Sequence, residues 1–298
     1  MEPTKYIWMN GEFIPWDEAK IHVLTHSLHY GGASFEGLRA YKTEKGTAIF
    51  RLKDHTERFF YSSEVLKINI PYSQKEINEA HIELIRKNNL EQGYIRPLSF
   101  YGYGKMGLNP KGAPVDIMIA CWPWGAYLPH DMINVKISPY IRIHPKSTVT
   151  DAKITGHYVN SILSVQSLDE NYQESMLLDY EGNIAEGPGE NFFMVKDGVI
   201  YTPKLGNILN GITRKTIIEL AEYLKIRFEE KVITPKEAFT ANEAFYTGTA
   251  AEITPIKSID DNIIGNGKIG PITRRIKDGY MDIVQGRNKD FEKYLTYC

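Results

Sequence analysis

A carboxylate on a glycine-proline-glycine turn is the feature that most constrains this sequence. Glu186 is followed by Gly187, Pro188 and Gly189, and an apolar stretch begins directly afterwards at Asn191. Core packing does not explain a carboxylate here, because a buried charge is costly unless it is paired. The glycines would let another group approach the backbone closely. The segment therefore predicts a turn that presents Glu186 to a ring nitrogen or to a cation.

The composition is that of an ordinary soluble globular protein. The chain has 298 residues, of which 42% are hydrophobic and 24% charged, and its net charge is −2, so we expect about two domains. No block of like charge favours a nucleic acid or a membrane surface. The best apolar run, residues 115–121, is too short to span a bilayer, and residues 1–5 contain no signal core. Two cysteines, Cys121 and Cys298, predict no disulfide framework and fit a cytoplasmic location.

Local patterns predict alternating strands and helices, an α+β (α/β) fold. Asn10-Gly11 is typical of a tight hairpin turn. Ser73 with Glu76, and Thr234 with Glu237, form capping boxes that begin helices. Pro97 predicts an edge strand or a bulge. We expect strands over residues 6–9, 12–14, 38–41, 48–51, 94–100, 115–122, 176–179, 191–196, 199–202 and 244–247, and helices over residues 53–66, 158–168 and 272–284, with others beginning near Ser73, Thr213 and Thr234.

A stretch of prolines and aromatic residues interrupts this pattern at residues 122–129. Two prolines and a glycine among aromatic side chains favour a stiff connector. We therefore predict a small α/β domain over residues 1–122, an interdomain connector over residues 123–132 and a large α/β domain over residues 133–298.

Lys153 is the candidate for a reactive amine. It lies between a threonine-rich loop and a predicted helix, where a side chain can point into a cleft, although most lysines are solvated surface residues. A lysine that forms a Schiff base needs a lowered pKa, from burial or from a nearby cation. Pyridoxal phosphate enzymes need such a lysine together with an acidic partner for the ring nitrogen. Lys153 and Glu186 could be that pair.

Other stretches carry groups that bind anions. Backbone N–H groups at a helix start favour a phosphate, an arginine can pair with it as a fixed fork, and a tyrosine and an arginine two apart share one strand face. Singly, each also fits a plain helix start or surface decoration. The residues are Ile212 and Thr213 at a helix start, Thr249 after a strand, Arg58, and the pair Tyr94 and Arg96. The sequence shows no metal-ligand spacing, nucleophile elbow or Walker loop.

In this order, the motifs resemble the branched-chain-amino-acid aminotransferases, which are pyridoxal phosphate enzymes of fold type IV. The resemblance runs from Tyr6 to Thr273. It is carried by Tyr30-Gly31 with Phe35-Glu36-Gly37, by Tyr94-Ile95-Arg96-Pro97, by Gly107-Leu108-Asn109-Pro110, by Trp124-Gly125-Ala126-Tyr127, by Glu186-Gly187 with Gly189-Glu190-Asn191, and by Gly248-Thr249-Ala250-Ala251-Glu252. It implies a reversible ping-pong transfer of the amino group of L-leucine, L-isoleucine or L-valine to 2-oxoglutarate, which gives branched 2-oxo acids and L-glutamate.

The resemblance also implies a role for each site residue. Lys153, in the large domain, would be the catalytic lysine. Pyridoxal 5'-phosphate would be bound by Arg58, Lys153, Tyr158, Glu186, Ile212, Thr213 and Thr249. Substrates would be bound by Tyr30, Phe35, Arg39, Tyr94, Arg96, Leu108, Tyr127, Thr249 and Ala250. Because Leu108 and Tyr30 would reach in from a neighbouring subunit, we expect a homodimer at least, or a hexamer made of three dimers.

Rival functions share the expected fold. They are a D-amino-acid aminotransferase, an (R)-amine transaminase and an aminodeoxychorismate lyase, and Tyr94 to Pro97 with Thr249 to Ala251 favour the branched-chain function over them. A non-catalytic cofactor binder or a structural protein would not need both Lys153 and Glu186. Two residues depart from the family pattern. His157 precedes Tyr158 where many relatives carry asparagine, and Lys105 lies in a loop that is often glycine-rich.

Overall fold

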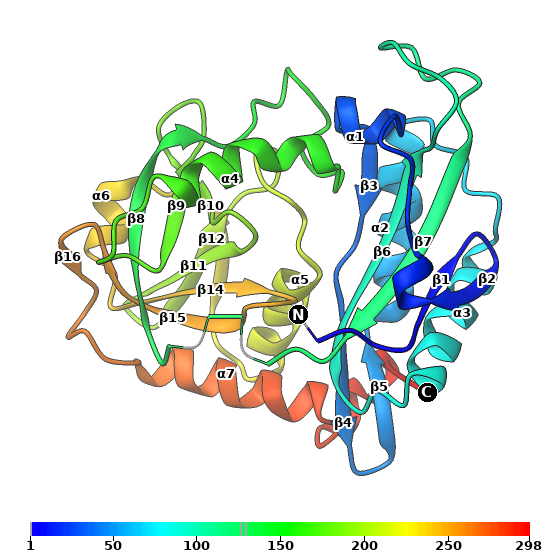
Figure 1. Cartoon of the computed structure of the whole chain (residues 1–298). Helices are drawn as coiled ribbons and strands as arrows, with labels where there is room; N and C mark the ends of the chain where they lie inside the picture. Colours follow the sequence, from blue (N-terminus) through cyan, green and yellow to red (C-terminus); the bar gives the residue numbers. More distant parts are fainter. Residues whose placement is uncertain (1, 126, 129) are drawn as a thin grey trace. The chain divides into compact units, whose positions relative to one another are not determined.

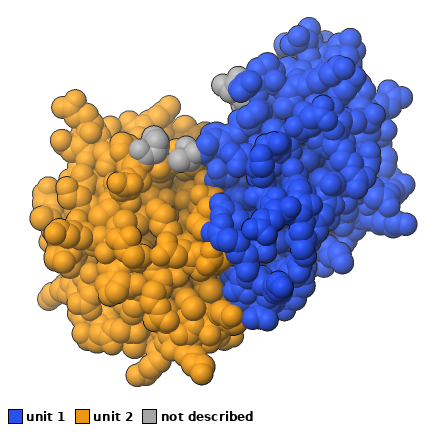
Figure 2. Space-filling model, turned by 90° about the horizontal axis from the view of Figure 1, so that it is seen from below, with its two compact units in different colours: residues 1–125, 152–156, 283–298 blue, residues 126–151, 157–282 orange. Residues whose placement is uncertain are grey.

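The chain divides into two compact units. The computed structural model describes residues 2–125, 127–128 and 130–298. One unit comprises Met1–Gly125, Ala152–Gly156 and Ile283–Cys298, and the other comprises Ala126–Asp151 and His157–Asp282 (Figure 2). The expected connector over residues 123–132 includes Ala126 and Pro129, which lie outside the described residues, so the domain boundaries stay a prediction.

The first unit is built on an antiparallel sheet (Figure 1). Its strand order is β17-β5-β4-β6-β7-β1-β2, and β3 also pairs with β6. Helices α2 and α3 pack against each other and against this sheet, and their apolar residues form one core with it. The elements are β1 Tyr6–Met9, β2 Glu12–Pro15, β3 Ala33–Phe35, β4 Leu38–Thr43, β5 Gly46–Phe50, β6 Gly93–Tyr101, β7 Val115–Trp122, β17 Leu295–Tyr297, α1 His26–Tyr30, α2 Leu52–Val65, α3 Gln74–Lys87, and the 3-10 turns Trp16–Glu18 and Lys289–Tyr294.

Turn and cap chemistry explains where these elements begin and end. Asn10 and Gly11 adopt φ angles of 49° and 96°, as the hairpin between β1 and β2 requires. The side chain of Ser73 accepts from the backbone N–H of Glu76, whose carboxylate accepts in return from the backbone N–H of Ser73. Both predictions are confirmed.

Pro97 lies in β6, a strand inside the sheet, so of the two predicted alternatives, an edge strand or a bulge, the edge strand is excluded. On one side Pro97 pairs in register with Ile119 of β7. On the other side, β4 pairs with β6 only as far as Ile95, and β3 pairs with it from Leu98 onward. The backbone N–H of Glu36 donates to the Pro97 carbonyl across this break, at 3.1 Å. Proline is tolerated because the neighbouring strand is interrupted where the ladder would need its missing N–H.

In the second unit, six strands close into a barrel (Figure 1). They follow the order β10-β9-β8-β15-β14-β11, and β11 pairs back onto β10. Strands β12 and β13 extend the sheet from β11, and β16 pairs with β15. The elements are β8 Ile133–Ile141, β9 Glu174–Leu178, β10 Ile184–Glu186, β11 Asn191–Lys196, β12 Val199–Pro203, β13 Phe228–Lys231, β14 Glu243–Gly248, β15 Glu252–Ile259, β16 Asn262–Ile263, α4 Val159–Gln166, α5 Ile212–Tyr223 and α6 Pro235–Phe239. The 3-10 turn Thr155–Tyr158 and α7 Pro271–Val284 each have two residues that belong to the first unit.

The glycine-proline-glycine turn makes the closing contact of this barrel. Glu186 ends β10 and pairs in register with Asn191, which begins β11. The backbone N–H of Gly187 donates to the Glu190 carbonyl at 2.8 Å, and the Glu190 carboxylate accepts from the N–H of Gly189 at 3.1 Å. A Cβ at Gly187 would lie 2.7 Å from Glu190 Oε2. A side chain at this position would press on the Glu190 carboxylate, which holds the far end of the turn.

Candidate active site

Lys153 is anchored through its backbone in the first unit. Its N–H donates to the hydroxyl of Ser62 at 2.8 Å, and its carbonyl accepts from the N–H of Phe35 at 3.1 Å. The half-buried side chain places Nζ 4.7 Å from the centre of the Phe35 ring. The amine therefore lies beside an aromatic wall, on a backbone that is fixed on both sides.

Arg58 lies on α2, one turn before Ser62 and on the same helix face. Its Nε donates to Glu36 Oε1 at 2.5 Å and its Nη2 to Glu36 Oε2 at 2.9 Å. One face of α2 thus carries both the predicted phosphate arginine and the hydroxyl that supports Lys153.

Tyr94 and Arg96 of β6 point to one face, as their spacing predicted. Arg96 Nη2 donates to the Tyr94 hydroxyl at 3.1 Å, and the Arg96 guanidinium lies 4.9 Å from the Phe35 ring centre. Arg96 Nε is buried and has no hydrogen-bond partner among the described residues. A buried donor of this kind suits an anionic ligand such as a carboxylate. A Cβ at Gly37 would lie 1.8 Å from the Tyr94 hydroxyl oxygen, so only glycine leaves that hydroxyl its place.

The other predicted residues of the first unit have different surroundings. Arg39 Nη2 donates to the carbonyls of Trp124 and Gly125 at 3.3 and 2.8 Å. Tyr30 and Leu108 are exposed, by 42% and 84%. The N–H of Gly107 donates to the Tyr30 hydroxyl at 3.3 Å, so Tyr30 holds the loop that carries Leu108.

The Lys105 amine donates to the Lys111 carbonyl within the loop of Leu108. This departure from the family pattern therefore has a local structural role.

Glu186 is a buried carboxylate surrounded by donors of the second unit. The Nε of Arg142 pairs with its Oε1, and the Nδ2 of Asn191 donates to its Oε2 at 3.0 Å. The backbone N–H of Leu209 points between the two oxygens, at 3.2 and 3.1 Å. Hydrogen bonds from a cation, an amide and a backbone N–H favour the ionised form of a carboxylic acid. Glu186 is thus built as a fixed anion, which is what a protonated ring nitrogen requires.

Sequence reasoning did not identify Arg142. It follows the end of β8, it is 8% exposed, and its Nη2 donates to the Thr150 carbonyl at 3.2 Å. No motif marks it, because β8 and β10 are separated along the chain and come together only by pairing with the two sides of β9. Asn191 was part of the quoted motif, and its role could have been inferred from hairpin pairing with Glu186.

The start of α5 offers donors for a phosphate. Ile212 and Thr213 are buried in its first turn, and the N-cap residue Gly211 provides no side-chain cap. A Cβ at the N-cap Gly211 would lie 2.0 Å from Asn191 Oδ1. Asn191 therefore lies between the Glu186 carboxylate and the helix start. An uncapped, buried helix N-terminus next to a fixed carboxylate fits a ligand that has both a phosphate and a ring nitrogen.

Tyr158 is the N-cap residue of α4. The neighbouring His157 is buried, and its Nε2 lies 2.6 Å from Thr148 Oγ1. This contact shows what the histidine does in place of the family's asparagine. It ties the start of α4 to the loop that follows β8.

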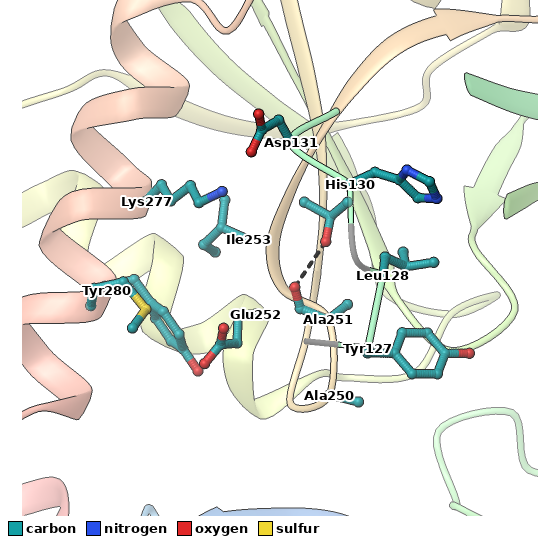
Figure 3. Close-up of a pocket in the computed structure, with 12 residues that line it drawn as sticks. Tyr127, Leu128, His130, Asp131, Ala250, Ala251, Glu252, Ile253, Lys277 and Tyr280 are labelled. Atoms are coloured by element: carbon teal, nitrogen blue, oxygen red, sulfur yellow. Dashed lines mark hydrogen bonds between the residues drawn. The ribbon is translucent and has the colours of Figure 1, made fainter. Parts of the chain in front are cut away.

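Tyr127 and Ala250, two of the predicted substrate residues, line one pocket of about 370 Å³ (Figure 3). Lys277 and Tyr280 of α7 form its opposite wall, and Figure 3 shows the Glu252 carboxylate directed at the Tyr280 ring end. The hydroxyl of Thr254 donates to the Ala251 carbonyl at 2.8 Å and holds the turn between β14 and β15. Thr249, in the same turn, is not part of this lining.

Two classes of feature can be checked across the described part of the chain. Among these residues, no group of three or more histidine, cysteine, aspartate or glutamate side chains could hold a metal ion. None of the helices described has the length and apolar character needed to cross a membrane.

The fold and the buried carboxylate beside a helix start are compatible with an aminotransferase, and the comparisons with known proteins show that class. The model of the family "Amino-transferase class IV" matches residues 33–259, and the chain belongs to this family. It is 48% identical to the branched-chain-amino-acid aminotransferase of Pseudomonas aeruginosa over 97% of this chain and 96% of that protein. It is 43% identical to the one from Escherichia coli K12, over 96% of this chain and 94% of the relative.

Solved structures give the same result. The branched-chain amino acid aminotransferase of Thermobaculum terrenum in its pyridoxal phosphate form matches with a TM-score of 0.93 and 35% identity, over 99% of each chain. The branched-chain aminotransferase of Thermoproteus uzoniensis with norvaline has a TM-score of 0.95 and 38% identity, over 98% of this chain and 99% of that one. The predicted fold, that of the fold type IV enzymes, and the predicted enzyme class are confirmed.

Proposed function

We propose that this chain is a branched-chain-amino-acid transaminase with pyridoxal 5'-phosphate as its cofactor. It moves the amino group of L-leucine, L-isoleucine or L-valine reversibly to 2-oxoglutarate by ping-pong kinetics, giving branched 2-oxo acids and L-glutamate. The observation that carries the proposal is the buried Glu186 carboxylate, fixed by Arg142, Asn191 and Leu209. The names of the relatives support the substrate class.

Each cofactor-binding residue has a chemical task. When bound, pyridoxal phosphate supplies an aldehyde that joins to amines and a ring that accepts an electron pair. Glu186 would keep a proton on the ring nitrogen, and Tyr158 would donate from its hydroxyl to the phenolic oxygen. Lys153 Nζ would carry the proton that leaves the substrate Cα. The guanidinium of Arg58, the N–H groups of Ile212 and Thr213, and Thr249 would hold the phosphate.

Substrate residues must accept two kinds of side chain in turn. Tyr30, Phe35, Tyr127 and Ala250 supply apolar and aromatic contacts for an aliphatic side chain. Arg96, with its buried donor, receives a carboxylate together with Tyr94. Arg39, Leu108 and Thr249 complete the proposed substrate-binding residues.

The assembly is proposed to be a homodimer at least, with three dimers joined as a hexamer as the larger form. The support is a set of large apolar residues on the first unit that are exposed in a monomer. Leu108 of one subunit would reach the substrate of its neighbour. The exposed residues are Ile21, Val23, Leu24, Leu28, Tyr30, Tyr103, Met106 and Leu108. We propose a cytoplasmic location.

A substrate panel tests this function. The purified holoprotein is mixed with single amino donors, and the visible absorbance of the bound cofactor is followed. L-leucine, L-isoleucine and L-valine should bleach the band, and 2-oxoglutarate should restore it. D-alanine and an (R)-amine should leave it unchanged. Bleaching by D-alanine or by the amine, and not by L-leucine, would contradict the proposal.

A further inference from the structure

We propose that Glu36 and His55 are positioning residues, which hold the Arg58 guanidinium in the orientation that binds the cofactor phosphate. The inference rests on the proposed function, and it extends that function to two residues which do not touch the ligand themselves. Its basis is a chain of buried contacts within the first unit.

Glu36 binds Arg58 through both carboxylate oxygens. The contacts of 2.5 and 2.9 Å involve Nε and Nη2, so the two planar groups face each other edge to edge. This bidentate geometry fixes the orientation of an arginine as well as its position. It uses the Nε–Nη2 edge of the guanidinium, whereas a phosphate would use the adjacent edge, formed by Nη1 and the second N–H of Nη2.

His55 fixes the carboxylate in its turn. Its Nδ1 lies 2.7 Å from Glu36 Oε2, and the N–H of Gly37 donates to the same oxygen at 3.2 Å. Both side chains are buried, Glu36 completely. His55 and Arg58 are three apart on α2, so one helix turn supplies both partners of the carboxylate.

The charge states of the three groups are consistent with this arrangement. Burial would raise the pKa of Glu36, but Arg58 and His55 hold that pKa well below its usual range. Burial lowers the pKa of His55. Glu36 is therefore an anion and His55 a neutral donor through Nδ1.

Orientation and charge predict opposite effects of removing Glu36 on phosphate affinity. The negative charge of Glu36 repels a nearby phosphate, so removing it should tighten phosphate binding if charge alone mattered. An arginine side chain carries about 2 kcal/mol of rotamer entropy, and prior fixation removes that cost from binding. Glu36 therefore favours phosphate binding by orienting Arg58, in spite of its own charge.

The test compares two ligands of the apoprotein, pyridoxal phosphate and pyridoxal, which lacks the phosphate. Dissociation constants are measured by titration calorimetry. Glu36→Gln should weaken pyridoxal phosphate binding by about 10-fold or more, as expected for loss of a hydrogen bond to a charged group, and leave pyridoxal binding unchanged. Glu83→Gln, which removes the exposed partner of Arg86 on α3, is the matched control and should change neither constant.

His55→Gln is the second variant, in case Glu36→Gln does not fold. It keeps the pair of Glu36 and Arg58 and should produce a smaller loss that is again confined to the phosphorylated ligand. Equal losses for the two ligands, or unchanged or tighter binding of pyridoxal phosphate, would overturn the inference. Failure of the wild-type protein to bind pyridoxal phosphate would instead overturn the proposed function.

Discussion

Arg142 pairs with Glu186 across 44 positions of sequence, and this contact defines the electrostatics of the carboxylate site in the second unit. Both side chains are buried. A lone buried carboxylate would tend to take up a proton, and a protonated acid could not hold the proton of a ring nitrogen. The guanidinium of Arg142, the amide of Asn191 and the N–H of Leu209 together favour the anion.

Arg142→Met should leave Glu186 without its cation. Breaking a buried ion pair costs about 3–5 kcal/mol, so the free energy of unfolding of the apoprotein should fall by that order. Cofactor affinity and kcat should also fall. Denaturant unfolding and cofactor titration measure these effects. Lys136→Met, which removes the more exposed partner of Asp260 at 3.4 Å, is the control and should cost under about 1 kcal/mol. Equal effects of the two substitutions would contradict a special role for Arg142.

Gly37→Ala should act through Tyr94. The new Cβ would lie 1.8 Å from the Tyr94 hydroxyl oxygen, and forced repacking of this kind costs about 1–3 kcal/mol. We expect KM for the amino acid to rise, because Tyr94 shares its hydroxyl with Arg96. The double variant Gly37→Ala with Tyr94→Phe removes the nearest clashing atom but keeps the ring carbon Cζ, 2.7 Å from the new Cβ, so it should recover part of the stability and none of the KM. No recovery of stability would mean that the clash is not the cause.

Glu174 should make the protein less stable as the pH rises from acid to neutral. Burial raises the pKa of Glu174 from 4.5 to about 7. A hydrogen bond from the Ser175 N–H lowers this pKa, but by less than burial raises it. The folded state therefore keeps a proton that the unfolded state loses, so stability falls as the pH rises from about 4.5 to about 7. Glu174→Gln should remove this part of the pH dependence. Denaturant unfolding at several pH values measures it, and identical slopes for variant and wild type would refute the assignment.

Leu108→Asp should disrupt the proposed assembly without unfolding the subunit. Leu108 is 84% exposed, so the substitution should hardly change the stability of the free subunit. In an apolar interface the new carboxylate would be buried, which weakens the assembly. Light scattering after gel filtration should show a smaller particle, and activity should fall with it. Val232→Asp, at an exposed apolar residue of the second unit, is the matched control. A Leu108→Asp protein of unchanged mass would argue against Leu108 as an interface residue.

Local chemistry made much of the fold predictable. The Asn10-Gly11 hairpin and both capping boxes depend on residues within a few positions of one another, and all three are present. Pro97 was predicted less well, because its tolerance comes from a break between β3 and β4 that only the assembled sheet reveals. Strand β17 was missed for a similar reason, since its three residues become a strand only through pairing with β5.

The candidate site also combines residues that local sequence predicts with residues that only long-range packing brings into place. Lys153, Glu186 and the start of α5 lie in motifs that can be identified from the sequence. The groups that orient them come from other segments. Arg142 reaches Glu186 because β8 and β10 both pair with β9, and Ser62 reaches the Lys153 backbone from α2. The sequence thus predicts the reacting groups, whereas their supports depend on long-range packing.

The identity of the lysine that bonds to the cofactor is the central claim, and it can be measured directly. The holoprotein is reduced with borohydride, digested, and its peptides are analysed by mass spectrometry. The account predicts that the reduced cofactor is attached to the peptide that contains Lys153, and that Lys153→Ala yields no such adduct and no amino transfer. A cofactor attached to another lysine, or undiminished transfer by Lys153→Ala, would contradict it.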